Sequence, residues 1–178
     1  SYPDDERKAF CFDGLCYNGE IYNDGKNAHQ GNEEKLWNNT DRRILFLMKD
    51  TNNNSDSDYR EWHWRNINHN FFNCIFKWLE GLSRISKDFI PTMENGDYAA
   101  VPNAVVTKYP LAIVNIKKIS GTSFVSNKTL YEYANRDKAF LQEQIRGILH
   151  PNIIVCGGGK GTVLNIAKNI IYEDESFR

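Results

Sequence analysis

Short apolar runs separated by polar segments define the elements that this chain is expected to form. Three runs, at 44–48, 111–116 and 152–156, are dominated by Ile, Leu, Val, Phe and Cys. Runs of this length without polar alternation are typical of strands buried on both faces of a parallel sheet. The middle run is interrupted by one polar residue, Asn115. The sequence therefore predicts three buried strands, with 111–116 as the one around which the others are arranged.

Helical periodicity occupies the segments between and after these strands. Apolar residues recur at steps of three and four over 64–82 and 130–149, and a last helix is predicted over 163–172. The alternation of strand and helix predicts an α/β fold, a three-layer α/β/α domain over 1–178 with a mostly parallel central sheet of about four strands. The polar residues 1–40 are expected to form an irregular lead-in. The apolar stripes expected to face the core are Trp64, Ile67, Phe71, Ile75, Trp78 and Leu82, and Leu130, Tyr133 or Ala134, Leu141, Ile145 and Ile148.

Composition and charge exclude several classes of protein. Of the 178 residues, 40% are hydrophobic and 25% charged, which is ordinary for a globular domain. The net charge of −1 provides no global attraction to nucleic acid or membrane, so any contact with DNA must be local. No run reaches the roughly 20 apolar residues of a membrane span, and no signal peptide is visible, so a cytoplasmic protein is expected. Unpaired thiols are expected at Cys11 and Cys16 and, in the interior, at Cys74 and Cys156.

Polar residues at the ends of the first two strands are the candidates for a site. Lys49 and Asp50 follow the first strand directly and begin a polar loop, at the strand end where open α/β sheets bind ligands. A plain surface turn is the alternative for this loop. The Asn115 amide inside an apolar strand costs about 1–3 kcal/mol unless its polar atoms are bonded. Lys117 and Lys118 follow it, and the pattern predicts a pocket for a polar, anionic molecule.

Two further motifs flank the third predicted strand. The segment 157–162 is rich in glycine and precedes the last helix, but the phosphate-loop pattern fails, because Ile154 stands at its first glycine position and Gly161 at its Ser/Thr position. Two interpretations stay open: backbone N–H groups that hold an anion, or a tight turn required by packing. The tripeptide at 150–152, His-Pro-Asn, enters a strand, so it is expected to end a helix at the opposite edge of the sheet.

In order and spacing, these segments together resemble the uracil-DNA glycosylase superfamily over about 44–171, and the iron–sulfur branch most closely. The resemblance rests on four pieces: the strand and polar loop 44–53, the strand that ends at Asn115, the helix and strand over 140–155, and the glycines Gly157 and Gly158.

The resemblance implies a DNA glycosylase that hydrolyses the N-glycosidic bond of uracil or a modified base flipped out of DNA. It implies that Asp50 is the catalytic carboxylate, which orients a water or stabilises positive charge on the sugar, and that Asn115 binds the base edge. The other contacts expected on this basis are Asn53 and Trp62 at the base, with Tyr59 as an alternative stacking residue, and Lys117, Lys118, Ser120 and Gly121 at DNA phosphates.

The chain also departs from the pattern of that family. The proline of its first motif is missing after Asp50, the cysteines of the iron–sulfur branch are absent, and no strand ending in a catalytic histidine precedes Arg178. No iron–sulfur cluster, other metal or cofactor is therefore expected. Two alternatives remain: a nucleic-acid, nucleotide or protein-binding module that kept the fold and lost the chemistry, and a nucleotide-binding enzyme that uses the glycine-rich segment.

Overall fold

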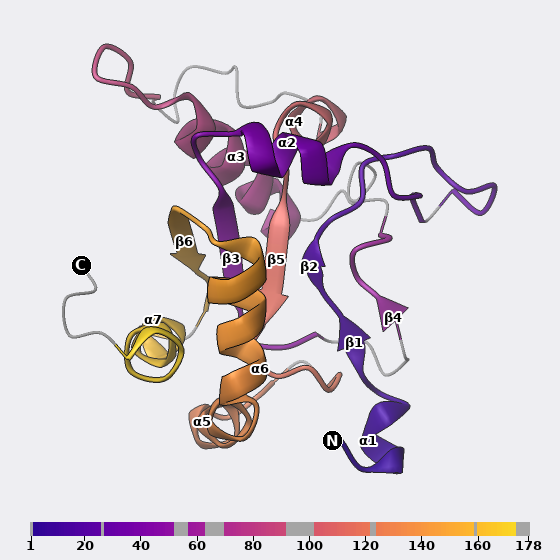
Figure 1. Cartoon of the computed structure of the whole chain (residues 1–178), viewed down its shortest axis with the longest axis vertical. Coiled ribbons are helices and arrows are strands. Elements are labelled where there is room, and N and C mark those ends of the chain that lie inside the picture. Colours follow the sequence, from indigo (N-terminus) through magenta and orange to yellow (C-terminus); the bar gives the residue numbers. More distant parts are fainter. Residues whose placement is uncertain are drawn as a thin grey trace.

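Three parallel strands form the centre of the fold (Figure 1). The computed structural model describes residues 2–25, 27–51, 57–62, 70–91, 102–121, 124–158 and 160–173. Strand β3 pairs in parallel with both β5 and β6, and β2 adds to the far side of β5 in antiparallel orientation. The resulting sheet has the order β2-β5-β3-β6, which confirms the predicted α/β class and the mostly parallel sheet of four strands. The bounds of the four strands are Gly14–Leu15 (β2), Ile44–Met48 (β3), Ala112–Asn115 (β5) and Ile153–Cys156 (β6).

Helices cover both faces of this sheet. Their bounds are Glu33–Asn39 (α2), Asn127–Arg136 (α5), Lys138–Gln142 (α6), Glu143–Leu149 (η3), Thr162–Ile166 (α7) and Ala167–Tyr172 (η4) on one face, and Asn70–Arg84 (α3) and Pro102–Lys108 (α4) on the other. Successive residues of a strand point to opposite faces, so Leu45 and Leu47 pack with the first group, whereas Ile44 and Phe46 pack with the second. The chain therefore has the three predicted layers. None of the helices within the described residues is long and apolar enough to cross a membrane.

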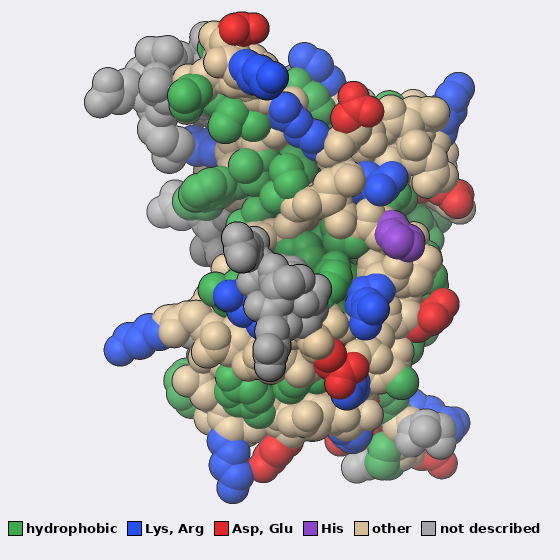
Figure 2. All heavy atoms as spheres, turned by 60° about the vertical axis from the view of Figure 1, so that its left-hand side comes forward, with side chains coloured by type: hydrophobic (Ala, Val, Ile, Leu, Met, Phe, Trp, Pro, Cys, Tyr) green, Lys and Arg blue, Asp and Glu red, His purple; other side chains and the backbone are tan. Residues whose placement is uncertain are grey.

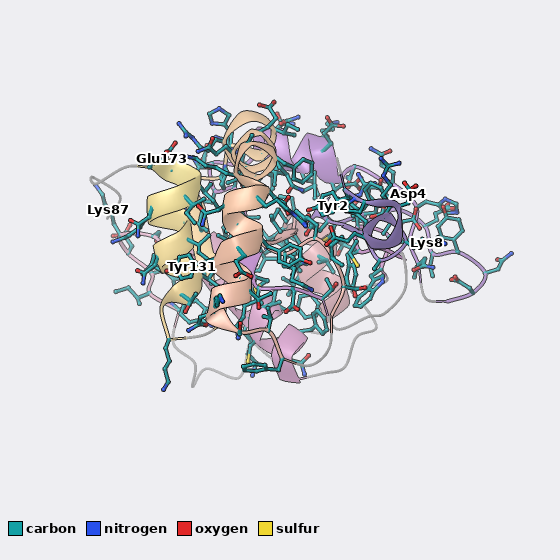
Figure 3. All side chains as sticks on the ribbon, turned by 90° about the horizontal axis from the view of Figure 1, so that it is seen from below. Tyr2, Asp4, Lys8, Lys87, Tyr131 and Glu173 are labelled. Carbon is teal, nitrogen blue, oxygen red and sulfur yellow. The ribbon has the colours of Figure 1, made fainter. Side chains whose placement is uncertain are left out.

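The N-terminal segment is more closely integrated into the fold than the sequence suggested. Besides β2, it contributes α1 (Asp4–Arg7) and β1 (Cys11–Phe12), which pairs with β4 (Ser57–Asp58). Tyr2, Asp4 and Lys8 of this segment are labelled in Figure 3, which views the molecule from below. The Tyr2 hydroxyl donates to the carboxylate of Asp137, just after α5, and Arg136 pairs with Glu6 at 2.9 Å.

The four cysteines differ in how deeply they are buried. Cys11 and Cys16, both in the N-terminal segment, take part in no disulfide within the described residues, as expected, and both are buried. The expectation of interior thiols in the two apolar elements is wrong for Cys74, which is exposed on α3, and Cys156 is only partly buried. Position in an apolar segment therefore did not decide burial, because one side of α3 faces solvent.

On α3, the buried face is rotated away from the predicted stripe. Ile75, Phe76 and Leu79 are buried against the sheet, whereas the side chain of Trp78 is 57% exposed. Trp78 lies about a quarter turn from the centre of the buried face, so its prediction as a core residue is wrong. The two earliest members of that stripe, at 64 and 67, lie outside the described residues, as does the side chain of Phe71.

The long helical segment before β6 changes its winding, and its buried face changes with it. Residues 143–149 form a π-helix, in which hydrogen bonds join residues five apart. This shift makes Leu149 the buried residue and leaves Ile148 70% exposed, so the predicted core position of Ile148 is wrong. His150 ends the helix in a left-handed conformation (φ 49°), and its N–H donates to the carbonyl of Ile145. Its predicted role in helix termination is confirmed.

This shift gives a direct prediction for two adjacent residues. Leu149→Ala should lower the free energy of unfolding by about 2–4 kcal/mol, because it removes buried methyl groups and leaves a cavity. Ile148→Ala should change it by less than about 0.5 kcal/mol, as expected at an exposed position. Urea denaturation of the two variants measures both values. Equal losses would show that the π-helical assignment of the buried face is wrong.

Candidate active site

Asp50 and Lys117 meet at the carboxyl ends of the two central strands. Met48 and Asn115 are paired in the sheet, and the pairing continues as the N–H of Lys117 donates to the carbonyl of Lys49 at 2.9 Å. This register brings the side chain of Lys117 close to that of Asp50, with 3.6 Å between Nζ and Oδ2. The strand order and register thus create an acid–lysine pair at the edge of the sheet where the sequence predicted a site.

The Asp50 carboxylate is buried but incompletely bonded. Its side chain is only 8% exposed, and among the described residues no donor forms a hydrogen bond with its Oδ2. Lys117 is too distant for such a bond, because its ammonium donates to the carbonyl of Ile119 and lies over the ring of Tyr133. Burial raises the pKa of the Asp50 carboxyl, and the charges of Lys117 and Lys49 oppose this shift. A carboxylate in this setting gains free energy when a donor or a positive charge reaches it.

The loop after β5 closes over the pair. The N–H of Gly121 donates to the carbonyl of Thr51 at 2.9 Å, which brings its Cα against both charged groups. A Cβ at this position would lie 2.9 Å from Nζ of Lys117 and 3.0 Å from Oδ2 of Asp50, so only glycine fits without displacing one of them. The hydroxyl of the preceding Ser120 is also buried and unbonded among the described residues. Ser120 and Gly121 therefore lie beside the Asp50–Lys117 pair, and their contact with DNA phosphates stays a prediction.

The glycines after β6 pack against the end of β3. A Cβ on Gly157 would lie 2.4 Å from the sulfur of Met48, and one on Gly158 (φ +99°) would lie 2.7 Å from Cε of Lys49. Close packing thus accounts for two of the glycines, which favours the tight-turn interpretation over anion binding. Gly159 lies outside the described residues.

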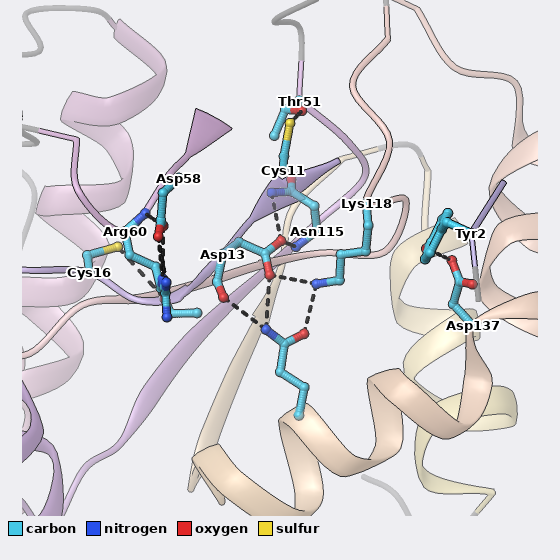
Figure 4. Close-up of polar contacts among 12 residues, drawn as sticks. Tyr2, Cys11, Asp13, Cys16, Thr51, Asp58, Arg60, Asn115, Lys118 and Asp137 are labelled. Atoms are coloured by element: carbon cyan, nitrogen blue, oxygen red, sulfur yellow. Dashed lines mark hydrogen bonds and ion pairs between the residues drawn. The ribbon is translucent and has the colours of Figure 1, made fainter. Parts of the chain in front are cut away.

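Asn115 belongs to a buried polar network centred on Asp13 (Figure 4). One oxygen of the Asp13 carboxylate accepts from the backbone N–H of Asn115 at 2.7 Å and from its side-chain amide at 3.2 Å. The other oxygen accepts from the ammonium of Lys118 at 2.6 Å and from the amide of Gln144 at 3.0 Å. Lys118 also donates to the amide oxygen of Gln144 at 2.8 Å. Both ends of the Asp13–Lys118 pair are therefore hydrogen-bonded more than once.

This network corrects one predicted role and constrains another. Lys118 is 1% exposed and its ammonium is held by Asp13 and Gln144, so its prediction as a DNA-phosphate ligand is wrong. Burial lowers the pKa of Lys118, and the Asp13 carboxylate opposes that shift. Asn115 does lie on the strand next to Asp50, but its amide nitrogen faces Asp13. Since a carboxylate only accepts hydrogen bonds, Asp13 fixes the orientation of this amide.

The predicted stacking residues belong to the interior. Tyr59 is buried, and its ring packs against that of Trp62 with 4.1 Å between centroids. Both join the apolar cluster beneath α3, and Trp62 also contacts Phe72 at 6.5 Å. A base could reach only the partly exposed side of Trp62. The remaining predicted base contact, Asn53, lies outside the described residues.

Two residues of the network, Asp13 and Gln144, escaped the sequence analysis. Asp13 carries a signal that could have identified it, because it is a single acid between the apolar residues Phe12 and Leu15 of a short segment. Gln144 stands between the buried positions Leu141 and Ile145 of a helix. Within the described ranges, no group of three or more His, Cys, Asp or Glu side chains could hold a metal ion.

Comparisons with protein-family models, curated proteins and solved structures gave no match.

The buried pair of Asp13 and Lys118 predicts that removing the lysine causes a large loss of stability, which removing the acid as well partly reverses. Lys118→Met should lower the free energy of unfolding by about 3–5 kcal/mol, because it leaves the charge of Asp13 buried without compensation. Adding Asp13→Leu should recover part of that loss, because it removes the uncompensated charge but leaves the N–H of Asn115 without its acceptor. Lys128→Met, in the exposed pair with Glu132 on α5, is the matched control and should cost about 1 kcal/mol or less. Equal losses for the two lysines in chemical denaturation would contradict this assignment.

Proposed function

We propose that this chain hydrolyses the N-glycosidic bond of a uracil or modified base flipped out of DNA. The observation that carries the proposal is the buried, incompletely bonded carboxylate of Asp50 at the carboxyl end of a central strand. Ligands of open α/β sheets bind at this edge. The resemblance of 44–171 to the uracil-DNA glycosylase superfamily gives the same residue the catalytic role.

The chemistry requires a negative charge close to the sugar. As the bond between C1′ and the base nitrogen breaks, its electron pair leaves with the base and positive charge develops on the sugar. Oδ2 of Asp50 stabilises that charge or accepts a hydrogen bond from the water whose oxygen forms the new bond to C1′. The pKa of Asp50, raised by burial, makes it a better proton acceptor than an exposed aspartate. Lys117 supplies a positive charge for the departing base or a phosphate.

DNA contact in this proposal is local. The face seen in Figure 2 carries Lys and Arg side chains interspersed with acidic and apolar ones, without a continuous basic surface. With a net charge of −1, binding relies on a few cations near the site, such as Lys49 and Lys117. Few phosphate contacts mean a weak dependence of affinity on salt.

A binding module of the same fold is the second candidate. The observation that favours it is the network around Asp13, which engages Asn115 and Lys118 inside the fold. These two residues were the expected base-binding and phosphate-binding groups. A chain that uses them for stability could hold DNA or a nucleotide at the Asp50 edge without cleaving a bond.

Substitution of the carboxylate separates the two functions. Asp50→Asn should lower base release at least about 10²-fold, because it removes the charge, and should leave DNA affinity nearly unchanged. Release is measured as alkali-labile sites in oligonucleotides that contain uracil or modified bases, and affinity by fluorescence anisotropy. Asp41→Asn, at the exposed opposite end of β3, is the matched control.

Unchanged turnover in Asp50→Asn would remove Asp50 from the mechanism. Wild-type protein that binds these oligonucleotides and releases no base from any of them would replace the hydrolase with the binding module.

A further inference from the structure

A second hollow lies beside the edge strand β2, away from Asp50. Its volume is about 310 Å³, at the lower end of the range for small-molecule sites. Leu15 of β2, Glu33 and Trp37 of α2, and Leu149 of η3 contribute to its wall, and the Asp50 pair does not. The proposed glycosylase chemistry leaves this hollow without a role.

Glu33 is a buried acid in this wall with an unused oxygen. The residue is 1% exposed. Its Oε2 accepts from the backbone N–H groups of Gly31 at 2.8 Å and Asn18 at 3.2 Å. Its Oε1 is buried and has no hydrogen-bond partner among the described residues. An acceptor left in this state costs about 1–3 kcal/mol, so a donor that enters from the hollow would recover free energy.

The charge of the wall is negative. Arg60 is neutralised by a close pair with Asp58, with 2.5 Å between Nη2 and Oδ2, and Asp13 is neutralised by Lys118. Within the described part of the wall, the acids Glu33 and Glu34 have no ion-pair partner. A positively charged ligand is therefore favoured over a neutral or anionic one.

The rest of the wall is largely apolar and aromatic. Leu15, Ile148 and Leu149 line the hollow together with Trp37 and Tyr17. The indole N–H of Trp37 donates to the carbonyl of Leu149 at 2.8 Å, which fixes the ring. Such a wall suits a flat apolar body, and an aromatic face also attracts a cation.

We propose that this cavity binds a small organic cation, an amine or amidine on a flat apolar body, whose N–H group donates to Oε1 of Glu33. The site is independent of the proposed glycosylase activity. Because Asp13 and Gln144 also line the hollow, the bound cation contacts the network that holds Asn115 and Lys118. Occupancy therefore raises the melting temperature of the whole domain.

Benzamidine, a flat aromatic amidinium, is the probe for this site. It should bind the wild-type protein in isothermal titration calorimetry, shift the NMR signal of the Trp37 indole N–H and raise the melting temperature. Its neutral isostere benzamide should bind at least tenfold more weakly. Glu33→Gln should weaken benzamidine binding at least tenfold, whereas Glu132→Gln, an exposed acid on α5, should leave it unchanged.

A second variant tests the same site if Glu33→Gln does not fold. Ile148 is an exposed residue of the wall, so Ile148→Arg adds a cation to the site without a large effect on stability and should weaken benzamidine binding severalfold. Absence of benzamidine binding to the wild type, equal affinity for benzamide, or full affinity in a folded Glu33→Gln or Ile148→Arg variant would each overturn the proposal.

Discussion

The buried ion pair between Asp13 and Lys118 connects parts of the chain that are far apart in sequence. It joins the residue before β2 to the residues after β5, and Gln144 brings η3 into the same network. Two charges can remain in the interior only when they are close and their other hydrogen-bonding groups are also bonded. The 2.6 Å separation and the shared amide of Gln144 meet that condition. The N-terminal segment is thereby part of the domain core.

This pair also determines which polar groups at the sheet edge remain for a ligand. Lys118 is held by Asp13 and Gln144, whereas Lys117, one residue earlier, stands 3.6 Å from an acid with one oxygen that no described residue bonds. The two adjacent lysines therefore have different roles, one structural and one directed to the site. Buried polar groups in folded proteins are normally satisfied, so the exception at Asp50 is the feature that most needs a functional explanation.

The sequence predicted the parts of this arrangement that depend on local pattern. Apolar runs identified the three parallel strands, and parallel strands end at one edge, so the meeting of Asp50 and Lys117 followed from topology. The network around Asp13 could not be predicted in the same way, because β2 pairs with residues about a hundred positions later and its two-residue length gives no periodic signal. The exposure of Ile148 depended on a π-helical segment, which shifts a helix face without changing its apolar composition.

The same reasoning explains why the second cavity was not anticipated. Its wall combines β2, α2 and η3, whose proximity is a consequence of the long-range pairing of β2. Glu33 in particular is one of two adjacent acids at the start of a polar helix, where sequence alone indicates a solvated position. In the fold it is buried, with one oxygen that accepts no hydrogen bond from the part of the chain that the structure describes.

The candidate site depends on an Asp50 carboxylate that is held at a cost to stability and would gain free energy from a ligand. Burial raises the pKa of this carboxyl in the folded state, so folding disfavours its charged form. The resulting destabilisation is full above the folded pKa and is lost as the pH falls through that value towards the unfolded one.

The most direct test is the free energy of unfolding of Asp50→Asn, measured by urea denaturation from neutral to acid pH. The variant should be more stable than the wild type near neutral pH, and the gain should disappear in acid. A variant less stable by about 1 kcal/mol or more near neutral pH would contradict the account, because Asp50 would then be a structural contact.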